Sequence, residues 1–360
     1  WRIMSVPHFS AEDLVDFGSR LFVAAGVSSE EATVVSESLV LSNMRGHDSH
    51  GIMRIPSYVE LMQKGSLLAG TTFEVLAETP AVIHGDAGYG FGQRHARELM
   101  DRVIEKARGL GIACGTARHC GHLGRLGEFT EQAARENLAA FGTVNDNGIL
   151  RVVAPPGGTE PRISTNPLSI AVPTGGRPLV FDGSTSAVAQ GKVLVRQLAD
   201  QQCPEGWLQD SDGNPTTNPH VLHAQPTGTL LPLGGDMSYK GFGLGLTLDV
   251  LVGGLSGGYC PPPRPDAKNC NSVLFVAWDP ELFGGLAHLK RQATELLDSV
   301  RSCARKPGVE QIQVPGDTSS ATEATRRRDG IPLKAGNWTS LAELAETLNI
   351  ATPSPLSSDR

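Results

Sequence analysis

The segment Arg45-Gly46-His47-Asp48-Ser49-His50-Gly51-Ile52-Met53-Arg54-Ile55-Pro56 carries two histidines, a hydroxyl, a carboxylate and two arginines. Imidazole is the side chain best suited to moving a proton near neutral pH. A guanidinium binds a small carboxylate through two parallel hydrogen bonds. The segment therefore predicts acid–base chemistry on a small organic acid. The residue types alone leave His47 and His50 as equal candidates for the proton carrier.

Two predicted helices precede this segment. Ser10 is a candidate N-cap, and the apolar spacing that follows it ends at Gly26. Ser28 with Glu31 forms a candidate capping box for a second helix, which runs out near Asn43. The histidines would then follow a helix C-terminus. The negative end of the helix dipole there favours a protonated imidazole.

The composition of the chain excludes several classes of protein. A chain of 360 residues can bury a large core and is expected to form two or more lobes. Its net charge of −7 argues against a general nucleic-acid binder, and no apolar run reaches the ~20 residues of a membrane span. Residues 1–10 lack the pattern of a signal peptide, and the six cysteines form no CxxC pair. We therefore expect a cytoplasmic protein with mostly buried thiols.

The periodicity further along the chain mixes strands and helices. Strands are expected at 81–84, 111–116, 138–144, 168–173, 179–182 and 273–277, and helices at 93–108, 128–136 and 242–255. The C-terminal part is expected to be mostly helical. Arg326-Arg327-Arg328 is interpreted there as a solvated helix face. No internal repeat is present, so the pattern predicts a layered α/β fold with a mixed sheet.

The glycines Gly88, Gly90 and Gly92 resemble a Rossmann fingerprint, but the third comes one residue too early. The strand around residues 112–117 also ends without the acid that would bind an adenosine ribose. We interpret the glycines as a tight strand–helix turn. Any dinucleotide would then bind through a different fold.

Two HxxH pairs, His47 with His50 and His119 with His122, leave a second hypothesis open. Together they would give a metal-dependent lyase or hydrolase. Neither pair has the helical HExxH arrangement, and the surrounding loops hold more glycine and arginine than carboxylate. Histidines that only form hydrogen bonds in turns are the structural alternative.

Two further segments suggest an anion. Residues 121–127 alternate glycine with other residues just before a helix, and Arg125 adds positive charge to backbone N–H groups. Lys240 lies near the start of a glycine-rich helix, an unfavourable place for a cation unless an anion is near. Both features fit contacts to phosphate. A plain strand–helix turn is the alternative for the first.

The chain resembles the type 2 malate/L-lactate dehydrogenase family, which is also called sulfolactate or ureidoglycolate dehydrogenase-like. The resemblance spans nearly the whole length, and residues 281–284 and 330–338 are similar to the hydroxycarboxylate dehydrogenase B branch. The other matching segments, in chain order, are 46–58, 121–127, 164–168, 182–189, 206–219, 240–243 and 255–258.

This resemblance implies a homodimer with a non-Rossmann NAD(P)-binding fold and helical N- and C-terminal segments. It also implies that His50 is the acid/base, that Ser49 and His122 border the substrate, and that His47 and Asp48 support them. Arg54, and after it Arg45, would hold the substrate carboxylate. The implied NAD or NADP contacts, besides His50, are Gly124, Arg125, Leu126, Val180, Phe181, Asp182, Gly183, Ser184, Tyr239, Lys240, Asn269, Val314, Pro315, Gly316 and Asp317.

We therefore expect an NAD(P)-dependent oxidoreductase that interconverts 2-oxo acids and 2-hydroxy acids of the malate, lactate or hydroxyphenylpyruvate kind. No metal is expected. Residues 1–120 with 300–360 are expected to form a helical domain for dimerisation and substrate binding, and residues 121–299 a domain that binds NAD(P). No nucleic-acid or membrane partner is expected.

Overall fold

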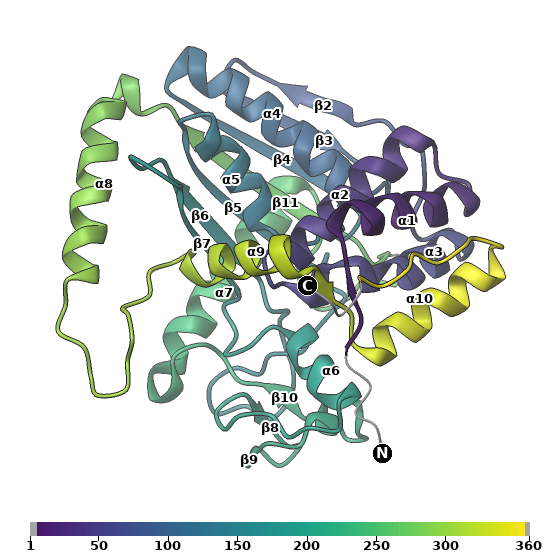
Figure 1. Ribbon diagram of the computed structural model, residues 1–360. Coiled ribbons are helices and arrows are strands. Elements are labelled where there is room, and N and C mark those ends of the chain that lie inside the picture. The colour runs from purple at the N-terminus through teal and green to yellow at the C-terminus, as the bar shows by residue number, and fades with distance from the viewer. Residues whose placement is uncertain (1–5, 266, 357–360) are drawn as a thin grey trace.

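The computed structural model describes residues 6–265 and 267–356 of the chain (Figure 1). Its strands are β1 His8–Phe9, β2 Glu74–Glu78, β3 Val82–Asp86, β4 Ile112–Cys120, β5 Ala139–Asn145, β6 Leu168–Val172, β7 Leu179–Gly183, β8 Leu208–Gln209, β9 Pro215–Thr216, β10 Thr229–Leu230, β11 Asn271–Trp278 and β12 Ile331–Pro332. Its α-helices are α1 Ala11–Ala24, α2 Ser29–Met44, α3 Ile55–Gln63, α4 Gly92–Leu110, α5 Gly127–Arg135, α6 Gln190–Leu198, α7 Ser238–Ser256, α8 Leu286–Arg301, α9 Asp317–Asp329 and α10 Ala335–Thr347.

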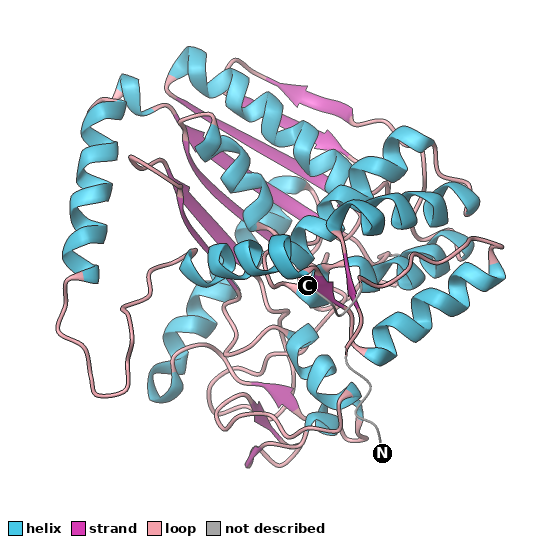
Figure 2. Cartoon of the chain, in the orientation of Figure 1, coloured by secondary structure: helices cyan, strands magenta, loops and turns pink. Residues whose placement is uncertain are grey.

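A seven-stranded mixed sheet forms the centre of the molecule, in the order β2-β3-β4-β11-β5-β6-β7 (Figure 2). Only β3 and β4 pair in parallel, joined through α4; every other neighbouring pair in this sheet is antiparallel. The late strand β11 lies between β4 and β5, and most of its residues are buried. The layered α/β fold is confirmed, and the sheet does not have the all-parallel order of a Rossmann fold.

Helices cover both faces of this sheet. Ala140 and Val144 of β5 share one apolar core with α4 and α5. The side chain of Asn145 points to the other face, where its amide donates to Asp249 of α7 at 2.8 Å. Since successive strand residues alternate between faces, α7 lies opposite α4 and α5. The sheet is therefore buried on both sides.

Helices α1, α2, α3 and α10 form a separate core at one end of the sheet. Ser10 and Ser28 cap α1 and α2 as predicted, because their hydroxyls accept from the N–H groups of Asp13 and Glu31. The predicted capping box is only half formed. The Glu31 carboxylate instead accepts from Gly70 N at 2.7 Å and from Arg94 at 3.2 Å. The Glu31 carboxylate thus connects α2 to the loop at Gly70 and to α4.

A third, smaller core packs α6 against β8 and β10. The seven-stranded sheet contains strands from both sides of residue 120 in the sequence, because β4 (112–120) pairs with β11 (271–278). The division that we expected at residue 120 thus falls at the end of a strand inside one sheet. In the described ranges no helix is both long and apolar enough to span a bilayer. All six cysteines are free, and Cys303 is exposed.

The glycine turn before α4 has the structural role that we predicted. A Cβ at Gly92 would lie 2.1 Å from the carbonyl oxygen of Gly121. Gly121 N also donates to Gly90 O at 2.8 Å. These glycines let the loop after β4, which carries His122, lie directly against the start of α4.

Candidate active site

The histidine segment leaves α2 through two short 3-10 turns, Asp48–His50 and Ile52–Arg54, and then enters α3. Asn43, in the last turn of α2, fixes this path with both ends of its amide. Its nitrogen donates to Asp48 at 2.8 Å, and its oxygen accepts from Ile52 N at 2.8 Å. A Cβ at Gly51 would lie 2.2 Å from the Asn43 oxygen, so this position requires glycine. The sequence thus builds a rigid turn around Ser49 and His50.

A cavity of about 540 Å³ opens beside this turn. It is formed by α3, the loop after β4, the end of β5 and the start of α6. The predicted site residues on its wall are His50, Arg54, His122, Gly124, Leu126 and Asn269. The structure therefore brings together the expected proton carrier, one expected carboxylate clamp and part of the expected cofactor contacts.

His122 is held in one tautomer. Gly124 N, which can only donate, lies 3.3 Å from His122 Nδ1, and the Tyr58 hydroxyl lies 2.7 Å from the same atom. The Gln93 amide in turn donates to the Tyr58 oxygen at 2.9 Å. Nδ1 is thus an acceptor, and Nε2 carries the hydrogen. Burial, followed by the charges of Arg54 and His50, lowers the pKa of His122 well below its usual range.

The His50 ring stacks on His122 with 5.5 Å between their centroids. Its Nδ1 lies 3.1 Å from the Ser49 hydroxyl, which can donate or accept. Burial, followed by the charges of Arg54 and His47, lowers the pKa of His50 to about 4. Our expectation of a protonated imidazole from the helix dipole is therefore wrong. Desolvation, followed by the positive charge of Arg54, outweighs a dipole effect that is strong only within one turn.

Arg54 presents a free guanidinium edge to this cavity. Its Nε donates to the Ser49 carbonyl at 2.7 Å, which holds the side chain in place. Among the described residues no carboxylate lies within ion-pair distance of Arg54. Other arginines nearby in the fold do pair with acids, namely Arg45, Arg94, Arg97 and Arg326. The two terminal nitrogens of Arg54 form no hydrogen bond to another described residue, so this lining side chain is available to a carboxylate.

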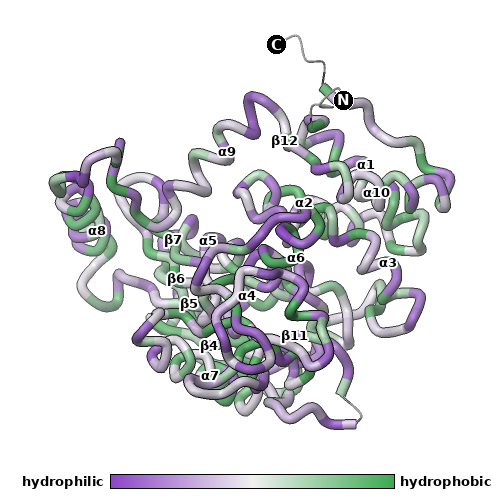
Figure 3. The backbone as a smooth tube through the Cα atoms, turned by 90° about the horizontal axis from the view of Figure 1, so that it is seen from below, coloured by the Kyte–Doolittle hydropathy of each residue, from purple (hydrophilic) through white to green (hydrophobic). Residues whose placement is uncertain are grey.

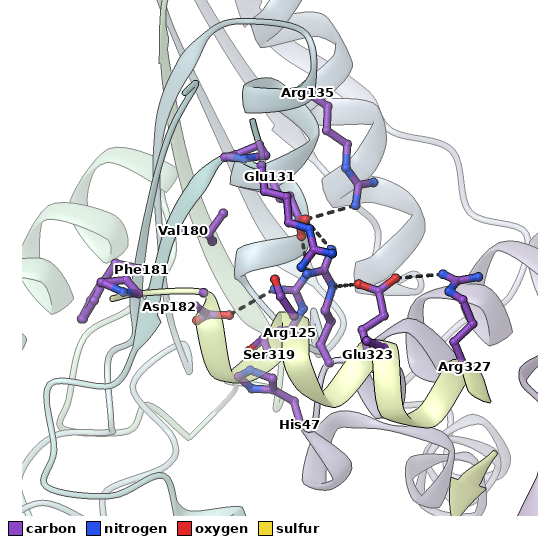
Figure 4. Close-up of a pocket in the computed structure, with 17 residues that line it drawn as sticks. His47, Arg125, Glu131, Arg135, Val180, Phe181, Asp182, Ser319, Glu323 and Arg327 are labelled. Atoms are coloured by element: carbon purple, nitrogen blue, oxygen red, sulfur yellow. Dashed lines mark hydrogen bonds and ion pairs between the residues drawn. The ribbon is translucent and has the colours of Figure 1, made fainter. Parts of the chain in front are cut away.

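The structure does not bring Arg45 to the His50 cavity. Arg45 instead lines a second cavity, of about 650 Å³, and pairs with Glu131 at 2.6 Å and with Glu323 at 3.2 Å. Figure 4 shows both of these carboxylates among the residues that line the cavity. His47 also lies on that wall, and burial lowers its pKa to about 4. The two arginines of the segment thus separate, because the turn sends their side chains into different cavities.

Arg125 and the start of α5 are already occupied by protein groups. Arg125 is buried and pairs with Glu131 at 2.9 Å. The first N–H of α5, at Gly127, donates to the Asp182 carboxylate at 2.8 Å. The anion that we expected at this helix start is therefore Asp182 itself. Arg125 Nε remains buried without an acceptor.

Residues 124–126 divide the two cavities, since Gly124 and Leu126 face His50 whereas Arg125 faces the second one. The other expected cofactor contacts on the second cavity are Val180, Phe181, Asp182, Pro315 and Gly316. Gly183, Ser184, Val314 and Asp317 are their chain neighbours. Tyr239 and Lys240 lie at the exposed start of α7 and line neither cavity.

Only one histidine of each HxxH pair reaches the shared cavity, where His50 lies against His122. His119 Nδ1 lies 2.9 Å from Asp86, and its ring stacks on Tyr89, whereas His47 lines the second cavity. Within residues 6–265 and 267–356, no three histidine, cysteine or acidic side chains gather in a way that could hold a metal ion. The four histidines of the two pairs therefore do not form one common set of ligands within these residues.

A family model described as malate/L-lactate dehydrogenase matches residues 9–342. The chain belongs to the malate/L-lactate dehydrogenase family. Hydroxycarboxylate dehydrogenase B from Escherichia coli strain K12 is 34% identical over 349 residues, which cover 95% of this chain and 94% of that one. Malate dehydrogenase from Pyrococcus abyssi is 32% identical over 346 residues, covering 94% of each.

Solved structures agree with this assignment to the malate/L-lactate dehydrogenase family. Malate dehydrogenase from Entamoeba histolytica superposes with a TM-score of 0.91 at 26% identity, covering 97% of this chain and 100% of that one. Malate dehydrogenase from Pyrococcus horikoshii gives 0.87 at 28% identity, covering 98% and 99%. The resemblance inferred from the motifs is confirmed, and the chain is an oxidoreductase of the hydroxycarboxylate dehydrogenase type.

Sequence reasoning missed Tyr58 and Gln93 as the residues that fix His122 in this member of the malate/L-lactate dehydrogenase family. A signal for Tyr58 was present, since it follows Arg54 by four residues and Pro56 is a good first-turn residue of a helix. Arg54, the N-cap of α3, and Tyr58 within the helix both line the cavity. Gln93 offered no such signal, because its contact with Tyr58 depends on tertiary packing.

Proposed function

We propose that this protein interconverts 2-oxo acids and 2-hydroxy acids with NADH or NADPH, with Arg54 holding the carboxylate and His50 moving the proton. One observation carries the proposal. A guanidinium without a carboxylate partner shares a cavity with two stacked, neutral histidines. A 2-oxo acid supplies the anion for the first and the carbonyl oxygen for the second.

The two histidines have different roles in this proposal. Nδ1 of His122 already accepts from Gly124 N, which cannot accept in return, so adding a proton there would break this contact. His122 therefore donates its fixed Nε2–H to the substrate oxygen. His50 faces only the Ser49 hydroxyl, which rotates to match either protonation state. His50 can thus gain and lose the proton that the reaction transfers.

Substrate binding would itself favour protonation of His50. The charge of Arg54 is the second cause, after burial, of the low pKa of His50. A carboxylate on Arg54 neutralises that charge and adds an anion to the cavity, so the pKa of His50 rises. The imidazolium then donates as the carbonyl oxygen becomes an alkoxide.

The residues that separate and line the two cavities fit an elongated dinucleotide. The His50 cavity would take the nicotinamide end, and the second cavity, rich in arginine, the adenosine and phosphates. Arg125 Nε, buried without an acceptor, lies at the division between them. The nicotinamide supplies the hydride when it is bound. This chain's own residues orient the acid, exclude water and carry the proton.

The walls of the His50 cavity favour an acid with one carboxylate and an apolar side chain. The cavity's apolar lining residues are Leu61, Leu67, Phe91, Leu123 and Leu150, among others, and neutral polar side chains such as Ser57 and Gln190 lie between them. Lys64 also lines the cavity, but it pairs with Glu60. Among the described lining residues, Arg54 is thus the one guanidinium or ammonium group without an acidic partner, so a second substrate carboxylate would meet only neutral or acidic side chains. Removing a carboxylate from water without a partner is unfavourable.

The test is a panel of 2-oxo acids assayed with NADH and NADPH by absorbance. We expect turnover, with kcat/KM at least about tenfold higher for phenylpyruvate or 2-oxoisocaproate than for oxaloacetate. Turnover that survives chelation is also expected. An enzyme that oxidises neither cofactor with any 2-oxo acid would contradict the proposal. A preference for oxaloacetate would contradict the account of the cavity walls alone.

We further propose a cytoplasmic homodimer, in which residues 121–299 contribute most of the cofactor site. Helix α7 supports the dimer, because it exposes Leu244, Val250, Leu251 and Leu255 although it also packs on the seven-stranded sheet. Helix α8 has no buried residue, and apolar and polar stretches alternate along it (Figure 3). Apolar area of this extent is typical of a subunit interface. The cysteine spacing supports a reducing compartment.

The substitutions Val250→Glu and Leu255→Glu, made together on α7, test the dimer. The wild type should show about twice the chain mass of 38.1 kDa in light scattering, and the double variant the mass of one chain. Leu110→Glu at the end of α4, which is 48% exposed, is the matched control and should leave the mass unchanged. A wild type with the mass of a single chain would overturn this proposal.

A further inference from the structure

Arg326 of helix α9 forms an ion pair with the histidine segment, residues 45–56. Both terminal nitrogens of Arg326 bind Asp48, at 2.5 and 2.9 Å, and one of them also donates to the carbonyl oxygen of Asn43. The Arg326 side chain is 12% exposed, whereas those of Arg327 and Arg328 are 73% exposed. The expected solvated face is therefore correct for the last two arginines and wrong for the first.

This contact lies at the start of the turn that carries His50. Asp48 opens the 3-10 turn, and His50 closes it two residues later. Arg326 thus ties the end of α2, through Asn43, to the first residue of the catalytic turn. A bidentate guanidinium–carboxylate pair fixes orientation as well as distance.

Two more contacts come from the same face of α9. Gly46, whose φ of +82° needs glycine, packs against Thr322, and Arg45 pairs with Glu323. Thr322, Glu323 and Arg326 follow the spacing of one helix face. At its other end α9 begins at Gly316, which lines the second cavity. The helix therefore connects the wall of one cavity to the turn of the other.

We propose that Arg326 is a positioning residue for Ser49 and His50, and this proposal rests on the proposed function. Without the Arg326 guanidinium, the Asp48 carboxylate keeps only its hydrogen bond from the Asn43 amide, and the turn loses its ion pair with α9. His50 would then sample orientations away from the substrate oxygen. A displacement of about 1 Å at a reacting group lowers the rate by about 10².

The experiment compares Arg326→Met, Arg326→Lys and Asp48→Asn with the matched control Arg328→Met, whose side chain pairs only with its neighbour Asp329. One readout is the rate at which diethylpyrocarbonate modifies His50, followed by peptide mass spectrometry, with exposed His288 on α8 as internal reference. The others are kcat, the Kd of NADH and the Tm.

In Arg326→Met we expect His50 to be modified several-fold faster relative to His288, and kcat to fall about tenfold to hundredfold. The Kd of NADH should stay within about twofold. Arg326→Lys should recover part of both losses, and the double variant with Asp48→Asn should add little to either one. Arg328→Met should match the wild type.

Unchanged His50 modification and unchanged kcat in folded Arg326→Met would overturn the proposal. A parallel fall of kcat, cofactor affinity and Tm, with no recovery in Arg326→Lys, would also overturn it by showing general destabilisation. If the wild type reduces no 2-oxo acid, the proposed function fails. The modification rate of His50 still decides the role of Arg326 in that case.

Discussion

His50→Gln should lower kcat for 2-oxo acid reduction by about 10²- to 10⁴-fold, because glutamine fills the space of imidazole but cannot supply a proton. The Kd of NADH, measured by fluorescence, should change little, since Gly124, Leu126 and Asn269 still line the cavity. Steady-state kinetics and cofactor titration on the same preparation give both values.

His122→Gln is the matched comparison. Glutamine can still donate one hydrogen bond to the substrate oxygen, so the loss of kcat should be smaller than in His50→Gln. Near-wild-type turnover in His50→Gln, together with a large loss in His122→Gln, would reverse the two roles. The stacked rings make this comparison direct, because both variants alter the same wall of the cavity.

The pH dependence follows from the same residue. With a pKa of about 4, His50 is neutral in the free protein through the physiological range. Oxidation of a 2-hydroxy acid needs the neutral base, so its kcat/KM should be level between pH 5 and 8. Reduction needs the imidazolium, so its kcat/KM should fall by about tenfold per pH unit over that range. His50→Gln should abolish this slope, whereas a level reduction profile in the wild type would assign the proton to another group.

Arg54→Met should lower kcat/KM for 2-oxo acids by about 10²- to 10³-fold, which corresponds to about 2.7–4 kcal/mol. The variant removes the cavity's guanidinium and leaves the substrate carboxylate without its bidentate partner. Most of the loss should appear in KM. Arg54→Lys keeps the charge but loses the fork, so its kcat/KM should lie between the other two.

Added guanidinium ion distinguishes a lost contact from a disturbed fold. At millimolar concentration it should partly restore turnover in Arg54→Ala, where a cavity of the right size remains, and should have no such effect on the wild type. Unchanged kcat/KM in Arg54→Met would show that the carboxylate binds elsewhere. Since Arg54 also holds the Ser49 carbonyl, the Tm of each variant is measured beside its kinetics.

Local signals in the sequence predicted the elements that depend on neighbouring residues. Ser10 and Ser28 became caps because an N-cap needs only the next three residues. The glycine turn before α4 was also predicted correctly, since its spacing excludes the Rossmann pattern. The histidine segment pointed to the chemistry, and the motifs around it pointed to the family.

Charged side chains were the main source of error, because their partners lie far away in the chain. Glu31 left its predicted capping box for Gly70 and Arg94. Arg326, in a run that looked solvated, pairs with Asp48 at a separation of 278 residues. The helix dipole predicted a charged His50, but the sequence carried no measure of how deeply the ring is buried. Ion pairs between residues so far apart in the sequence can be identified only from the tertiary structure.

The position of β11 also has a consequence for how this chain is made. Its residues 271–278 form the middle of the sheet, so a growing chain presents β4 and β5 as two open edges until these residues have been synthesised. Exposed edges of this kind pair readily with other chains. Nascent chains that end before residue 271 should therefore aggregate or recruit chaperones, and release of β11 from the ribosome should be the step that seals the sheet.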